Sequence, residues 1–257
     1  MCETGSIVIG VDVVGTNIAV GVGIPGVVHE GHALTVPNLI GWTENVELVR
    51  LLGEWTAVAA RGGSNILGLW MGTGVGGGPI LDGRPYLGSR GAAGEIGYVV
   101  VLAGGALCTC GCRGCAEAHA GRRSLRGVAT AMVDTGWKTS FFTIRDDEGK
   151  TKLTSTVSAK ALGNNDPLAT KLFDTAIETL GIAIGSTVNL LELDRVVIGG
   201  GLAEKLGPHL AERLFDAAIP WMLQPDPDLK FVVAELEDDD AGVVGATVLA
   251  RTALIAD

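Results

Sequence analysis

Apolar residues fall into two patterns along the chain. Short unbroken runs at 7–13, 17–22 and 66–71 have the length of β-strands and are bounded by glycine-rich turns. Similar runs at 194–201 and 230–235 predict two further strands, and the first of these ends in three glycines. Strands in both halves of the chain, separated by longer helical patterns, indicate an α/β fold.

The longest periodic stretch predicts a core helix from Pro167 to Leu191, because its apolar residues recur every three to four positions. Asp166 followed by Pro167 is typical of a helix start. The polar segment 135–153 is expected to be a surface excursion. Further helices are expected over 44–60, 124–132, 202–222 (with a break at 207–208) and 242–254.

Charge and composition exclude several classes of protein. The 257 residues are 47% hydrophobic and 19% charged, which is typical of a folded domain. The net charge of −10 disfavours nucleic acid as a partner. No apolar run reaches the length of about 18 residues that spans a membrane, and the N-terminus lacks the basic region of a signal peptide. We therefore expect a cytoplasmic protein.

Four of the five cysteines lie between residues 108 and 115 with the spacing CxCxCxxC. In a reducing compartment this spacing favours a metal site over disulfides.

Two glycine-containing turns offer phosphate-binding chemistry. In VDVVGTN, Asp12 could hold hydrated Mg²⁺ while Gly15 and Thr16 offer N–H and hydroxyl groups to phosphate, although a hairpin with a polar turn is the alternative. GTGVGGG at 72–78 is expected to be a loop whose N–H groups wrap a phosphate. It is not a Walker A motif, because no GK[ST] follows. The repeated arrangement suggests two related α/β lobes with a nucleotide between them.

Together these motifs resemble the ROK family of sugar kinases and repressors, which has the two-lobed actin-like ATPase (ribonuclease H-like) fold. DVVGT resembles the first phosphate motif, GTGVGGG the second, VVIGGGLAE the adenosine motif and GAAGEIG the sugar-binding segment. CTCGCRGCAE matches the signature CxCGxxGCxE at every fixed position. The resemblance implies ATP-dependent phosphorylation of a glucose-like hexose or a hexosamine, and a homodimer or homotetramer.

The resemblance also implies roles for individual residues. Contacts to ATP and Mg²⁺ are implied for Asp12, Gly15, Thr16, Thr73, Gly74, Gly200 and Gly201. Contacts to the sugar are implied for Asn38, Asn45, Glu95, Tyr98 and Glu117.

The catalytic base departs from the family pattern. An ENDANAAALGE-like segment provides the catalytic Asp in family kinases, and the corresponding ENVELVRLLGE has Val46 at that position. Glu47 is a weak substitute, because it points about 100° away on a helix. Alternatively, the catalytic segment is deleted altogether. We therefore expect impaired turnover. The alternative is an inactive sugar- or nucleotide-binding relative that lacks its own DNA-binding domain.

The lobes and the metal ligands also differ from the family pattern. We expect a shortened small lobe at 1–62, closed by a helix at 242–257, and a large lobe at 63–241 with a zinc insert around 108–117. Either small-lobe segments are deleted, or the chain as given omits them. The family's zinc-binding histidine is Tyr98 here, so Cys112 is expected to join the other three cysteines. A three-cysteine site completed by water or His119 is the alternative. The expected zinc ligands are Cys108, Cys110, Cys112 and Cys115.

Overall fold

The computed structural model describes residues 54–55, 59–224, 228–236 and 245, and the backbone of five strands between residues 8 and 43. Those five strands form two small antiparallel sheets, β1-β2 and β3-β4-β5. The two strands predicted over 7–13 and 17–22 are confirmed, and they pair antiparallel, with Asp12 in β1 opposite Ala19 in β2. The helices expected over 44–60 and 242–254 lie largely outside the described residues. The strands are β1 Val8–Val14, β2 Asn17–Gly23, β3 Val27–His29, β4 His32–Leu39 and β5 Trp42–Thr43.

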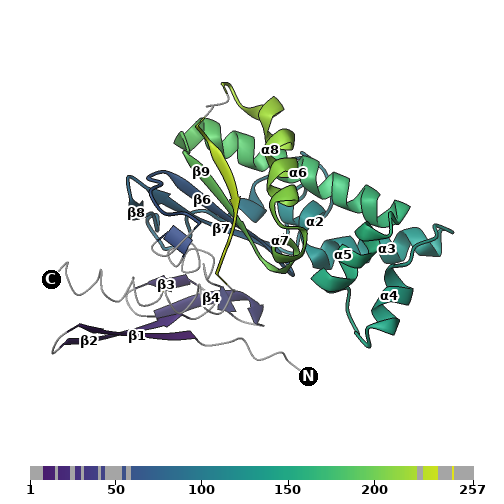
Figure 1. The fold of residues 1–257 in the computed structure, drawn as a ribbon, viewed down its shortest axis with the longest axis horizontal. Helices are drawn as coiled ribbons and strands as arrows, with labels where there is room; N and C mark the ends of the chain where they lie inside the picture. Colours follow the sequence, from purple (N-terminus) through teal and green to yellow (C-terminus); the bar gives the residue numbers. More distant parts are fainter. Residues whose placement is uncertain are drawn as a thin grey trace.

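The largest sheet is mixed and has the strand order β10-β9-β6-β7-β8 (Figure 1). β6 is parallel to β9, and β9 is parallel to β10. β7 runs antiparallel to β6 and to β8. The three strands predicted over 66–71, 194–201 and 230–235 are therefore confirmed, as is the α/β class. The bounds are β6 Ile66–Met71, β7 Val75–Leu81, β8 Arg84–Pro85, β9 Arg195–Gly199 and β10 Lys230–Val233.

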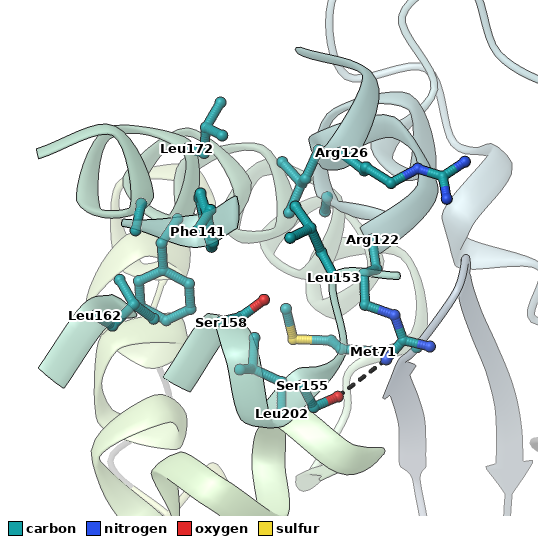
Figure 2. Close-up of a pocket in the computed structure, with 15 residues that line it drawn as sticks. Met71, Arg122, Arg126, Phe141, Leu153, Ser155, Ser158, Leu162, Leu172 and Leu202 are labelled. Atoms are coloured by element: carbon teal, nitrogen blue, oxygen red, sulfur yellow. Dashed lines mark hydrogen bonds between the residues drawn. The ribbon is translucent and has the colours of Figure 1, made fainter. Parts of the chain in front are cut away.

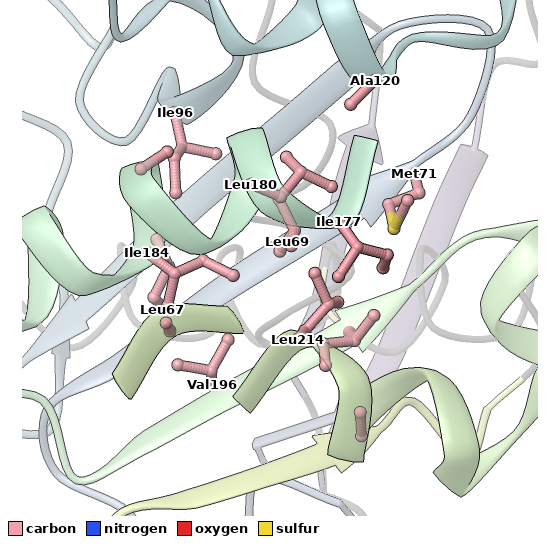
Figure 3. Packing of buried hydrophobic residues seen from close by; sticks show 14 of the residues in the cluster. Leu67, Leu69, Met71, Ile96, Ala120, Ile177, Leu180, Ile184, Val196 and Leu214 are labelled. Atoms are coloured by element: carbon pink, nitrogen blue, oxygen red, sulfur yellow. The ribbon is translucent and has the colours of Figure 1, made fainter. Parts of the chain in front are cut away.

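Both faces of this sheet are buried. Leu67, Leu69 and Met71 of β6 face a core shared with the long helix α6, whereas Ile66 and Trp70 face a second core on the opposite side. Figure 3 shows the first core, with side chains of α6 and α8 packed over β6 and β9. A strand that is buried on both faces has no polar side, which is why β6 reads as a continuous apolar run.

Helices cover the first face of the sheet and extend beyond it (Figure 1). The predicted long helix is confirmed as α6, and the predicted break is confirmed at Gly207, which has φ +59° between α7 and α8. In the described part of the chain, no helix is long and apolar enough to cross a membrane. The bounds are η1 Ile96–Tyr98, α2 Ala116–Ala120, α3 Arg122–Asp134, α4 Phe141–Asp147, α5 Ser155–Gly163, α6 Pro167–Leu191, α7 Gly201–Leu206, α8 Pro208–Ala218 and η2 Ile219–Trp221.

The expectation that 135–153 is a polar surface excursion is wrong in part. The segment contains α4, and its residues Phe141 and Leu153 are buried in a third core. This core also takes Val157 from α5 and Leu168 from α6. The misreading has a physical cause: a few apolar residues spread over a polar segment show no helical period, although each fills a space between helices.

Asp166 connects the start of α6 to the segment before α4. Its buried carboxylate accepts hydrogen bonds from the N–H of Ala169, from the N–H and hydroxyl of Ser140, and from the hydroxyl of Thr139. Burial by itself would raise the pKa of Asp166. The hydrogen bonds outweigh burial and hold this pKa below its usual value, so the folded protein favours the charged carboxylate.

We expect Asp166→Ala to lower the free energy of unfolding by about 3 kcal/mol, because a helix cap is lost and buried donors lose their acceptor. Urea denaturation measures this change. Asp147→Ala, which removes an exposed carboxylate on α4, is the control and should change the free energy of unfolding by less than about 0.5 kcal/mol.

The charged form of Asp166 stabilises the fold above the unfolded-state pKa, and this contribution is lost as pH falls through the lower folded pKa. The difference between Asp166→Ala and the unmodified chain should therefore shrink below about pH 4; a difference that does not depend on pH would contradict the assignment.

Candidate functional site

Two glycine turns meet at the carboxyl ends of the neighbouring parallel strands β6 and β9. The first glycine turn, residues 72–74, follows β6 and is closed by the N–H of Gly72 donating to the carbonyl of Gly74 (2.9 Å). The second glycine turn, residues 200–201, follows β9. Gly200 has φ +91°, and a side chain there would collide with the backbone of Met71. Only glycine therefore allows the second turn to lie this close to the end of β6.

The place where these turns meet is a topological switch point. From β6 the chain passes to β7 on one side of the sheet, and it later returns through β9 on the other side. In open α/β sheets, the crevice beyond the carboxyl ends of such strands is where ligands bind.

The expectation of a glycine loop over 72–78 is wrong beyond Gly74, because residues from Val75 onward form β7. Gly77 lies in this strand under tight packing, where an added Cβ would come within 2.8 Å of the carbonyls of Gly68 and Gly94. Glycines can serve phosphate binding and close backbone packing equally, and sequence spacing does not separate the two uses. The phosphate-binding expectation is therefore narrowed to Thr73 and Gly74.

A cavity of about 50 Å³ opens beside the first glycine turn. Figure 2 shows apolar side chains, among them Phe141 and Leu162, around its interior. Arg122, Ser155 and Ser158 provide polar groups at its wall. The cavity thus combines an apolar interior with a few polar atoms, which is the usual composition of a small-molecule pocket.

Glu117 of α2 is held against the first glycine turn. One carboxylate oxygen accepts the N–H of Val75 (2.9 Å), and the other accepts the hydroxyl of Thr109 (3.1 Å). Gly74 has no room for a side chain, because it would collide with this carboxylate. Glu117 therefore links the cysteine-rich loop to the strand that follows the first glycine turn. A carboxylate has about four lone-pair positions, so each oxygen can still accept a further hydrogen bond.

Tyr98 lies close to two of the other predicted sugar contacts. Burial, followed by the negative charges of Glu117 and Glu95, raises the pKa of Tyr98 to about 12. The phenol therefore stays protonated at neutral pH and can donate a hydrogen bond. Its side chain packs against the cluster formed by Cys108, Cys115 and Ala118.

Three of the four cysteines converge. The sulfur atoms of Cys108, Cys110 and Cys115 all lie within 4.8 Å of one another, and Cys110 and Cys115 are 3.6 Å apart. Tetrahedral zinc with bonds of about 2.3 Å places its sulfur ligands about 3.8 Å apart, so the spacing fits this ion. Hydrogen bonding, chiefly from the backbone of Cys112, lowers the pKa of the Cys110 thiol, whereas burial raises the pKa of Cys115 to about 12.

The two candidates for a fourth ligand lie outside this group of three. Cys112 is exposed, and its backbone carbonyl accepts the N–H of Cys108 (2.8 Å). The Nε2 atom of His119 is buried, has no hydrogen-bond partner among the described residues, and faces Gly105. The described geometry therefore supplies three sulfurs, with the fourth position left to Cys112, His119 or water.

Several predicted site residues lie outside the described residues. Asp12 and Asn38 are placed only as backbone positions in β1 and β4. The structure does not describe Gly15, Thr16, Asn45, Val46 or Glu47.

Sequence reasoning missed two polar side chains at the first glycine turn. Arg122, the first residue of α3, donates to the hydroxyl of Thr73 (3.1 Å) and to the hydroxyl of Ser155 (3.0 Å). The available signal was the pair of arginines at 122 and 123, which begins five residues after the last residue of the cysteine signature, Glu117. Nothing in the sequence signalled Ser155, because α5 was not predicted.

Comparison with known proteins gives a consistent result. A model of the ROK family matches residues 51–253. A glucokinase of Halalkalibacterium halodurans is 31% identical over 91% of this chain and 76% of its own length. The N-acetylgalactosamine kinase AgaK of Shewanella sp. is 33% identical over 72% of this chain, which spans 63% of that relative.

The fold is shared with a solved structure. A ROK family glucokinase from Streptomyces griseus, in complex with glucose and AMPPNP, aligns with a TM-score of 0.75 over 96% of this chain and 100% of that chain, at 23% identity. The chain therefore has the predicted actin-like ATPase fold.

Proposed function

Because the chain belongs to the ROK family, we propose that it transfers a phosphoryl group from ATP to a hydroxyl of a hexose or hexosamine. The observation that carries this proposal is the close approach of Gly200 to the backbone of Met71, which places the second glycine turn at the carboxyl end of β6, beside an apolar cavity. A narrow, glycine-lined crevice suits a phosphate chain, because backbone N–H groups can approach the phosphate oxygens closely there.

The proposal gives each group a role in positioning the reactants. Thr73 and Gly74, together with Gly15 and Thr16 of the first motif, hold the β- and γ-phosphates, while Gly200 and Gly201 allow the nucleoside to approach the backbone. Asp12 orients Mg²⁺, which neutralises phosphate charge when bound. Positioning and charge stabilisation supply most of the rate in phosphoryl transfer.

For the sugar, we propose hydroxyl contacts from Glu95, Tyr98 and Glu117, together with Asn38 and Asn45. Tyr98 supports this role because its phenol stays protonated beside two carboxylates. Several hydrogen-bond acceptors and one neutral donor can distinguish sugars by the positions of their hydroxyl groups. A sugar with a hydroxyl in the wrong position would leave a buried polar group of the protein without a partner, which is costly.

We propose that Cys108, Cys110 and Cys115 hold structural Zn²⁺, with the fourth position taken by Cys112, His119 or water. When bound, the ion cross-links the loop that carries Thr109, and Thr109 in turn holds Glu117. A cytoplasmic location and a homodimer or homotetramer complete the proposal.

A second candidate function is sugar or nucleotide binding without turnover. Val46 favours it, because a valine at the place of the catalytic base cannot accept a proton. Both candidates use the same crevice, so binding alone does not separate them.

Incubation with Mg-ATP and either glucose or N-acetylgalactosamine, followed by mass spectrometry of the sugar, tests the first candidate. We expect slow but enzyme-dependent formation of sugar phosphate. Gly200→Val is the matched negative control, because its side chain would collide with Met71 and close the crevice. Binding of ATP and sugar with no sugar phosphate formed would contradict the kinase proposal and support the second candidate.

A further inference from the structure

We propose that Arg122 binds a phosphate of the nucleotide and so makes the crevice selective for nucleoside polyphosphates over nucleosides. This inference rests on the proposed function, because it places a nucleotide between the two glycine turns. An acidic chain must bind phosphate through local groups, and the sequence suggested backbone N–H groups and a metal ion for that task. The structure adds a guanidinium.

Arg122 is anchored to the first glycine turn through its backbone. The N–H of Arg122 donates to the carbonyl of Gly72 (3.2 Å), and the N–H of Arg123 donates to the carbonyl of Thr73 (3.0 Å). The first turn of α3 is therefore fixed to the proposed phosphate site, and the Arg122 side chain starts from a defined position.

The guanidinium of Arg122 bridges the two glycine turns. It donates through Nη2 to the hydroxyl of Thr73 in the first turn and through Nη1 to the hydroxyl of Ser155. Figure 2 shows the bond to Ser155 at the edge of the cavity. Ser155 lies against the second turn, because an added Cβ on Gly201 would come within 2.9 Å of its hydroxyl oxygen. The cation is thus placed where a phosphate chain between the turns would pass.

The charge distribution supports an anionic ligand at this position. α3 begins with two arginines and has no acidic residue in its first turn, although the helix dipole disfavours cations there. Arginine offers five N–H donors in a planar fork, and this geometry suits phosphate oxygens.

The test is calorimetric titration of the full chain with ATP, ADP and adenosine in the presence of Mg²⁺. We expect Arg122→Gln to weaken ATP binding by about 10- to 100-fold, because a charge-assisted hydrogen bond is lost. Adenosine binding should change by less than about twofold, since the glutamine can still bond the hydroxyls. Arg122→Lys keeps the charge without the fork and should give an intermediate loss of about 5- to 10-fold.

Arg123→Gln is the matched control: an exposed arginine at the next position, with the same change in net charge. It should leave ATP affinity within about twofold. Equal weakening of ATP and adenosine by Arg122→Gln would show a purely structural brace and overturn the inference, as would unchanged ATP binding. Absence of ATP binding in the unmodified chain would overturn the inference together with the proposed function. Arg122-dependent ATP binding without sugar phosphorylation would overturn only the kinase proposal.

Discussion

Val46→Asp is expected to raise kcat for glucose phosphorylation by roughly 10²–10⁴-fold. In the alignment that the resemblance predicts, position 46 is that of the aspartate that accepts the hydroxyl proton in the ROK pattern, and a valine side chain has no basic atom. Without an acceptor, the attacking hydroxyl keeps its proton as the new bond to phosphorus forms, and this raises the barrier. A coupled spectrophotometric assay at saturating ATP and glucose measures the change.

Val46→Asn is the matched control, because the amide has nearly the same size as the carboxylate but cannot take up the proton. Its kcat should stay at the level of the unmodified chain. Equal rates for the aspartate and asparagine variants would contradict the assignment of position 46 and support the alternative that the catalytic segment is deleted. A kcat of tens per second in the unmodified chain would show that another carboxylate accepts the proton.

Cys115→Ser is expected to reduce bound zinc from near one ion per chain to below about 0.1, because a structural site depends on each of its thiolates. Cys115 is buried, and its sulfur lies 3.6 Å from that of Cys110. The loss should also lower the melting temperature, since the loop around Thr109 and Glu117 loses its cross-link. Elemental analysis by mass spectrometry and thermal unfolding measure the two effects.

Cys112→Ser separates the three-cysteine site from the four-cysteine site. Cys112 is exposed and lies outside the group of three sulfurs. This variant should keep near one zinc per chain, with an affinity no more than about tenfold lower. Equal zinc loss in both variants would make Cys112 an obligatory ligand. Zinc content far below one in the unmodified chain would contradict the metal site itself.

The main elements of the large lobe could be predicted from sequence because each has one dominant signal. Burial on both faces makes β6 a continuous apolar run, and the 3.6-residue period together with the Asp166 cap defines α6. Elements without such a signal were missed. α4 and α5 are short, and they are stabilised by a core whose members come from four helices and from the segment between α4 and α5.

The sequence by itself determined the family, the α/β class and the set of candidate ligands, because those depend on ordered motifs such as GTGVGGG and the cysteine signature. Only the tertiary structure decided how these residues are used. It limited the predicted glycine loop to 72–74, since β7 begins at Val75 and strand packing requires Gly77. It also brought three cysteines together, joined Glu117 to Thr109, and placed Arg122 between Thr73 and Ser155. These contacts join residues from different elements, such as Arg122 with Ser155, 33 positions apart, so no local pattern in the chain records them.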